Sequence, residues 1–179
     1  MKIIKRILLV ILGIVVILLI VALFIPKDYS VERSVTINKP TTEVFDYIKY
    51  LKNQNQYSKW AKMDTNAKVT FTGTDATPGF ISAWDSKKDD VGAGEQEIKS
   101  ITPNQRIDYE LRFKRPWSSV ANAYMSTDST GANQTTVKWG FKGTMPYPMN
   151  IMKLFMNMEK MIGKDLQTGL DNLKVIEEK

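Results

Sequence analysis

The most constraining feature of the chain is a long region, residues 68–143, in which apolar residues recur at every second position. This alternation predicts β-strands, because successive side chains of a strand point to opposite faces. It is clearest in residues 105–113, where charged residues occupy one face. The apolar face of that strand carries Ile107, Tyr109, Leu111 and Phe113.

Turn signals rich in Gly, Pro, Asn and Asp divide the region into six predicted strands. A further alternating segment, residues 31–37, predicts a strand near the start of the domain, followed by helices over residues 41–51 and 57–63. Short connections favour an antiparallel sheet with one covered and one solvated face. The six strands are 68–73, 80–86, 95–101, 105–113, 122–127 and 135–143.

The segment from Asn150 to Lys174 repeats apolar residues at spacings of three and four, which predicts one long amphipathic helix. From Asp165 onward the apolar stripe is narrow, whereas the first half is rich in Met. An antiparallel sheet with a single long helix to cover it predicts an α+β fold in which the sheet curls around the helix.

The N-terminus carries an uncharged apolar run, Ile7–Ile25, preceded by three basic residues. As a helix the run would extend about 28 Å, close to the hydrocarbon thickness of a bilayer. A membrane anchor over residues 1–25 is therefore expected, then a linker at 26–28 and one domain at 29–179. The preceding cations predict a cytoplasmic N-terminus and an extracytoplasmic domain. A cleaved signal peptide is the alternative, although its apolar region is usually shorter.

Composition removes several functional classes. The chain has no Cys and no His, which excludes thiolate nucleophiles, disulfides and the commonest zinc ligands. Without the three basic residues that precede the apolar run, 22 basic residues face 19 acidic ones, too small an excess to indicate nucleic-acid binding. The acidic pairs Glu95/Glu97 and Asp108/Glu110 alternate onto the solvated face. No cofactor, metal site or catalytic residue is expected.

Several local motifs make residues 29–177 resemble the SRPBCC superfamily, also called START-like or helix-grip proteins, in its branch of polyketide cyclase/dehydrase and lipid transport. The matching segments are 31–40 with 41–48, 57–60, Gly79 with Trp84, 92–94, 114–117, 136–139 and, as the most specific, 155–174. The resemblance implies a curved sheet of about seven strands around a long C-terminal helix. It also implies a deep cavity between them for lipids, sterols, polyketides or plant hormones.

The residues expected to line this cavity are mostly aromatic and Met side chains of the strands and the last helix. Large aromatic residues also dominate ordinary cores, so each has a purely structural alternative. Met suits a cavity wall that adapts to its ligand. A few polar side chains, Gln96 among them, are expected near the apolar wall to orient the ligand. The candidates are Trp84, Tyr109, Leu111, Phe113, Asn122, Tyr124, Trp139, Phe141, Met152, Phe155, Met158 and Ile162.

These observations favour a membrane-anchored binding or carrier domain whose partners are a hydrophobic small molecule and, through the N-terminal helix, the membrane. Two alternatives remain open. One is a cyclase or dehydratase in which Tyr109, Asn122 or Tyr124 orients a polar substrate. The other is a ligand-free interaction module of a membrane complex, which a solidly packed core would favour.

Overall fold

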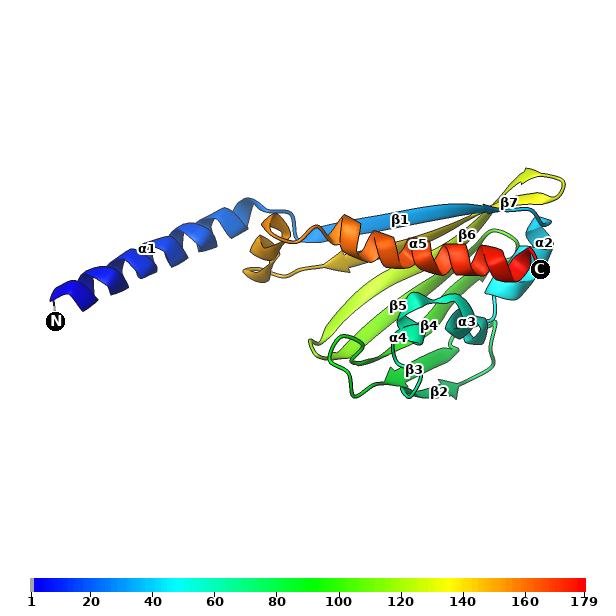
Figure 1. Ribbon diagram of the computed structural model, residues 1–179, viewed down its shortest axis with the longest axis horizontal. Coiled ribbons are helices and arrows are strands. Elements are labelled where there is room, and N and C mark those ends of the chain that lie inside the picture. The colour runs from blue at the N-terminus through cyan, green and yellow to red at the C-terminus, as the bar shows by residue number, and fades with distance from the viewer. Residues whose placement is uncertain (1) are drawn as a thin grey trace.

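A computed structural model describes residues 2–179 of the chain and shows an α+β domain with a projecting N-terminal helix (Figure 1). The helices are α1 (Lys2–Phe24), α2 (Thr41–Ile48), α3 (Gln54–Tyr57), α4 (Lys59–Met63) and α5 (Met158–Glu177), with short 3-10 helices η1 (Leu51–Asn53) and η2 (Met149–Leu154). The strands are β1 (Asp28–Ile37), β2 (Lys68–Thr72), β3 (Ile81–Asp85), β4 (Ala93–Thr102), β5 (Arg106–Arg115), β6 (Ser119–Gly131) and β7 (Gln134–Thr144).

The seven strands form one antiparallel sheet in the order β1-β7-β6-β5-β4-β3-β2. Strands β2 to β7 form a meander. Strand β1 pairs with β7 and forms the other edge of the sheet, with Asp28 opposite Thr144 and Ile37 opposite Thr135. The predicted sheet and its short connections are confirmed. The alternation of the sequence predicts most of this, because the central strands each have one face to bury, although all residues of the edge strand β2 are exposed.

Helix α5 lies along β1 and runs in the same direction (Figure 1). The Arg33 guanidinium forms an ion pair with Glu159 at 2.7 Å near the start of α5, and Lys174 Nζ donates to the Thr36 carbonyl at 2.7 Å near its end. Leu166, Leu170 and Leu173 of α5 are buried in a core shared with α2 and the sheet. The narrow stripe predicted for the second half of the last helix is confirmed.

The first half of the predicted C-terminal helix is corrected by the structure. Residues 149–154 form the separate 3-10 helix η2, and α5 begins only at Met158. Asn157 ends the interruption, because its side chain accepts a hydrogen bond from the Lys160 amide at 2.8 Å and so caps α5. Apolar periodicity continued through residues 150–158, but Leu154 and Phe155 have no sheet face to cover and are exposed.

Helix α1 is the one helix among residues 2–179 that is long and apolar enough to cross a bilayer by length and composition. At about 1.5 Å per residue its 23 residues extend roughly 35 Å. It leaves the domain immediately before β1, and its main contact with the domain is with η2 (Figure 1).

Candidate ligand cavity

A cavity of about 520 Å³ lies between the sheet, α3 and α4, and the first turns of α5. Its wall is formed by residues of all seven strands on one side and by Trp60, Ala61, Ile162 and Leu166 on the other. The cavity exists because α5 covers the inner face of the sheet near β1, while the short helices α3 and α4 cover the same face near β2 and β3 incompletely (Figure 1). This volume lies within the range of small-molecule sites in proteins.

Six of the predicted cavity residues line this space: Trp84, Leu111, Phe113, Trp139, Phe141 and Ile162. Their aromatic rings are held by edge-to-face or stacked contacts. Trp84 meets Phe113 at a centroid distance of 5.9 Å, and Trp139 meets Trp60 at 6.1 Å. Such pairs restrain the rings. The apolar wall is therefore built of ordered rings rather than of flexible side chains.

Gly94 of β4 allows the Trp84 ring to lie across the neighbouring strand. A Cβ atom at position 94 would be 2.6 Å from Cζ2 of Trp84 and 2.8 Å from the Arg112 carbonyl oxygen. Any other residue would have to displace this ring or the backbone of β5. The Trp84 indole also donates to the Val91 carbonyl at 3.3 Å, which ties the ring to the loop at the cavity edge.

Two of the polar residues predicted near the cavity lie elsewhere. Asn122 and Tyr124 are on the outer face of β6, because Ala121, Ala123 and Met125 occupy its inner face. There the Tyr124 hydroxyl contacts the Glu32 carboxylate. The prediction chose the wrong face of β6 as the inner one, because Ala121 and Ala123 rather than the aromatic Tyr124 face inward.

Tyr109 does point inward, but it belongs to the packed part of the core rather than to the cavity wall. It is only 2% exposed and lies opposite Ile98 and Ala123 on the neighbouring strands. Burial raises the pKa of the Tyr109 phenol well above its usual value, so the group remains protonated. It is a core residue in this structure.

The predicted residues Met152, Phe155 and Met158 also do not line the cavity. Met152 belongs to η2, Phe155 lies in the segment between η2 and α5, and Met158 is the first residue of α5. Their positions differ from the expectation because the continuous helix that would have carried them to the sheet is interrupted.

The polar side chains of the wall come mainly from segments that sequence reasoning did not assign to the site. Gln54, Ser58 and Asp64 come from the region of α3 and α4, while Gln96, as expected, comes from β4. Among residues 2–179, the side-chain amides of Gln54 and Gln96 have no hydrogen-bond partner. No periodicity in the sequence marked these residues, because Gln54 lies between the two predicted helices and its burial follows from tertiary packing. These amides are free to bind a polar group of a ligand.

Asp64 is the one carboxylate of the inner wall that is held by a defined network. Its side chain accepts hydrogen bonds from the Ser86 hydroxyl and, at 3.0 Å, from the backbone amide of Asn66. The Ser86 hydroxyl, then the Asn66 amide and the charge of Lys88 lower the pKa of Asp64. The carboxylate is therefore ionised at neutral pH and suits binding of a hydrogen-bond donor rather than proton abstraction.

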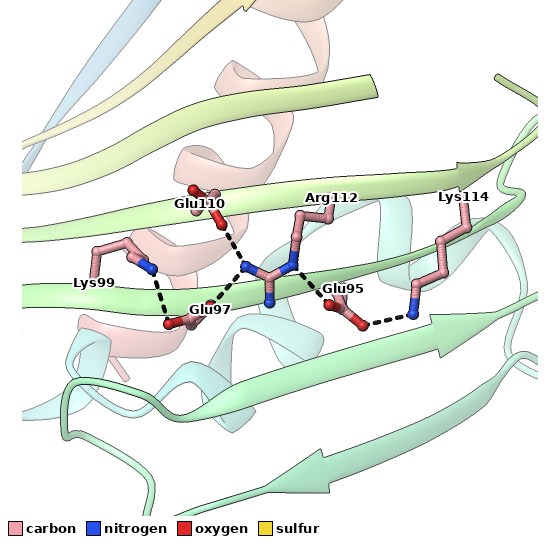
Figure 2. A network of polar contacts seen from close by, with 6 residues as sticks. All are labelled: Glu95, Glu97, Lys99, Glu110, Arg112 and Lys114. Atoms are coloured by element: carbon pink, nitrogen blue, oxygen red, sulfur yellow. Dashed lines mark hydrogen bonds and ion pairs between the residues drawn. The ribbon is translucent and has the colours of Figure 1, made fainter. Parts of the chain in front are cut away.

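Of the two acidic pairs noted in the sequence, Glu95, Glu97 and Glu110 belong to an ion network on the outer face of β4 and β5 (Figure 2), whereas Asp108 pairs with Arg106. Arg112 lies at the centre of this network. It contacts Glu95 at 2.7 Å, Glu97 at 2.6 Å and also Glu110. Hydrogen bonds from Lys114 and Arg112 lower the pKa of Glu95. These carboxylates are remote from the cavity, as the alternation predicted, and no cluster of metal-ligating residues occurs within the described part of the chain.

Comparison with known proteins places this architecture in a family. A sequence profile described as polyketide cyclase / dehydrase and lipid transport matches residues 28–176. No curated protein sequence matches the chain significantly.

Solved structures with the same fold are distant in sequence. A protein from Nitrosospira multiformis has a TM-score of 0.59 at 14% identity, covering 83% of this chain and 96% of that one. The di-domain ARO/CYC StfQ from the steffimycin biosynthetic pathway has a TM-score of 0.63 at 9% identity, covering 85% of this chain and 51% of that one. DynU16 from the dynemicin biosynthetic locus has a TM-score of 0.54 at 14% identity, covering 82% and 46% respectively. With the profile match over nearly all of the domain, the chain belongs to the polyketide cyclase/dehydrase and lipid transport family of SRPBCC-type proteins.

Proposed function

We propose that this protein is a membrane-anchored binding or carrier domain for a hydrophobic small molecule held between the sheet and α5. The observation that carries the proposal is the 520 Å³ cavity with its wall of Trp, Phe, Leu and Ile side chains. Apolar walls with a few polar groups are typical of ligand sites. The unpaired amides of Gln54 and Gln96 and the carboxylate of Asp64 suit a ligand with one or two polar groups on an apolar body.

The anchor is the second part of the proposal. Helix α1 has the length and composition of a membrane span, and three basic residues before the apolar run favour a cytoplasmic N-terminus. Retention of α1 is supported by its contacts with the domain. Asn150 donates to the carbonyl groups of Ala22 and Ile25, and signal cleavage before the domain would remove these partners.

The two alternatives are less well supported. A cyclase or dehydratase function is suggested by the biosynthetic proteins of the same fold, but the residues first considered for it, Tyr109, Asn122 and Tyr124, do not line the cavity. A ligand-free interaction module would not require an internal space of this volume.

A fluorescent fatty acid tests the binding function. Cis-parinaric acid accepts excitation energy from tryptophan, and Trp84 and Trp139 lie in the cavity wall. We expect saturable energy transfer when the probe is titrated into the detergent-solubilised full chain.

Two neighbouring residues of β3 provide a matched pair of variants. Ser82 lines the cavity, whereas Ala83 pairs with Glu95 and points to the outer face. Ser82→Phe should weaken the saturable component at least tenfold, because the ring occupies the cavity, and Ala83→Phe should leave it unchanged. Equal binding by both variants, or no saturable component in the wild type, would refute ligand binding in this cavity.

A further inference from the structure

One end of the domain brings together several segments that are distant in sequence. The strand register places the start of β1 beside the end of β7, and then the β5–β6 turn beside the start of β4. Helix α1 therefore leaves the domain at the same end as η2 and the β5–β6 turn. Figure 1 shows α1 projecting from this end, opposite α2 and the C-terminus.

η2 is fastened to the end of α1 by side-chain hydrogen bonds. The Asn150 amide donates to the carbonyl oxygens of Ala22 at 2.7 Å and Ile25 at 2.8 Å, and both Asn150 and Ala22 are almost completely buried. Lys153 Nζ donates to the carbonyls of Pro26 and Asp28 at 2.7 and 2.6 Å. η2 thus satisfies carbonyl groups at and just beyond the C-terminus of α1 and is held beside the exit of that helix.

This fastened segment exposes large apolar side chains. Phe155 is 75% and Leu154 is 60% exposed, and the segment around them carries very little charge. Between Met145 and Met158 the only charged residue is Lys153, and its ammonium group is already bound to backbone carbonyls. We call the exposed apolar residues of this region the η2 collar. They are Tyr147, Met149, Met152, Leu154 and Phe155.

The mouth of the cavity lies at the same end of the sheet. The β5–β6 turn contributes Arg115, Pro116, Trp117 and Ser119 to the cavity lining, and all of these residues are exposed. Trp117 is the most exposed aromatic residue of the lining, at 80%. An indole exposed to this degree is costly in water but favoured at the boundary between bilayer and water.

We propose that the η2 collar rests in the interfacial layer of the same bilayer that α1 crosses, and that Trp117 and the cavity mouth face that membrane surface. A hydrophobic ligand then passes between the bilayer and the cavity without crossing water. The inference rests on the proposed role of α1 as an anchor. The occupant of the collar is the bilayer because the collar is continuous with the end of α1 and has no free charge that would oppose contact with acyl chains.

Depth-dependent fluorescence quenching tests the contact directly. The chain has no Cys, so single Cys variants carry a nitrobenzoxadiazole label at one defined position. Leu154→Cys reports on the collar and Trp117→Cys on the mouth. Val175→Cys, on α5, is the matched control, because Val175 is 59% and Leu154 60% exposed. The full chain is reconstituted in phosphatidylcholine vesicles with lipids that carry a doxyl quencher near the headgroup.

We expect at least threefold stronger quenching at positions 154 and 117 than at position 175. Equal quenching at 154 and 175 would refute the bilayer contact, and a dimer cross-link or a bound protein at the collar would assign it to another occupant. Quenching at 154 but not at 117 would refute the orientation of the mouth. Resistance to carbonate extraction is measured on the same vesicles. This measurement distinguishes a protein whose α1 does not insert from one whose α1 inserts but whose η2 collar does not contact the bilayer.

A transfer assay measures the consequence for the ligand. Leu154→Glu combined with Phe155→Glu should slow delivery of cis-parinaric acid from vesicles to the cavity at least tenfold, while the final occupancy remains that of the wild type. Unchanged transfer rates would contradict direct exchange through this surface. If the wild-type cavity takes up no cis-parinaric acid at all, the proposed binding function itself is refuted.

Discussion

Gly169 of α5 lies against the cavity residue Trp139, and Gly169→Ala tests whether this contact sets the position of the ring. A Cβ atom at position 169 would be 2.7 Å from Cζ3 of Trp139, closer than side-chain contacts allow. The ring has little room to move, because it is 4% exposed and meets Tyr57 at 5.8 Å and Trp60 at 6.1 Å between centroids.

Two opposing contributions determine the expected change in the free energy of unfolding. Replacing Gly by Ala within a helix stabilises it by about 1 kcal/mol. Overpacking a well-filled core costs about 1–3 kcal/mol. Because the indole is held on two sides, we expect the upper part of this range and a net destabilisation of about 1–2 kcal/mol.

Gly163→Ala is the matched control in the same helix. A Cβ atom there would be 2.2 Å from Nη2 of Arg33, which is the far end of a flexible side chain. Displacing it weakens the ion pair with Glu159, a surface interaction worth about 0–1 kcal/mol. With the gain of about 1 kcal/mol from helix propensity, this variant should be neutral or slightly more stable.

Urea unfolding of the detergent-solubilised full chain, followed by tryptophan fluorescence, measures both changes. All four tryptophans lie in the domain, so the signal does not report on α1. Gly169→Ala should also weaken cis-parinaric acid binding, because Trp139 is part of the cavity wall and the added methyl group presses on its ring. If both substitutions shift the free energy of unfolding equally, the contact between Gly169 and Trp139 does not constrain the fold, and the reasoning is wrong.

Three further predictions concern charged and polar contacts. Arg112→Leu leaves three carboxylates of the outer network without their shared cation, and should lower stability at pH 7 by about 1–2 kcal/mol, more than loss of a single surface pair. Because Arg112 helps to lower the pKa of Glu95 and Glu97, wild-type stability should fall as pH drops through these lowered pKa values. The difference in urea midpoint between the two proteins should therefore shrink in acid. Burial, with the charge of Glu43, raises the pKa of Glu177 to about 7 from 4.5, so the folded state binds more protons between these pH values and the free energy of unfolding falls as pH rises through them. Glu177→Gln should therefore be more stable than the wild type at pH 8 but not at pH 4. The opposite order in thermal unfolding would refute the buried environment of the Glu177 carboxyl. Asn150→Ala removes two hydrogen bonds to the end of α1, and amide hydrogen exchange at Ile25, Lys27 and Asp28 should accelerate about tenfold or more. Unchanged exchange would show that η2 is not needed to hold this junction.

The sequence by itself determined the sheet, the covered face of most strands and the narrow Leu stripe of α5. The physical reason is that these features follow from periodicity, since a strand or helix with one apolar face has one way to bury it. Residues such as Trp84, Phe113 and Trp139 were placed in the cavity wall on the same basis. The apolar run at the N-terminus likewise determined α1.

Only the tertiary structure decided which inward residues border empty space and which are packed solid. Tyr109 and Leu111 share a face of β5, yet Tyr109 is in the core and Leu111 in the cavity wall, because coverage by α5 and α4 differs along the strand. The interruption before α5 was also invisible in the apolar pattern. The segment before α5 is instead held by Asn150, which bonds to carbonyls more than a hundred positions earlier in the chain, a contact that no local periodicity encodes.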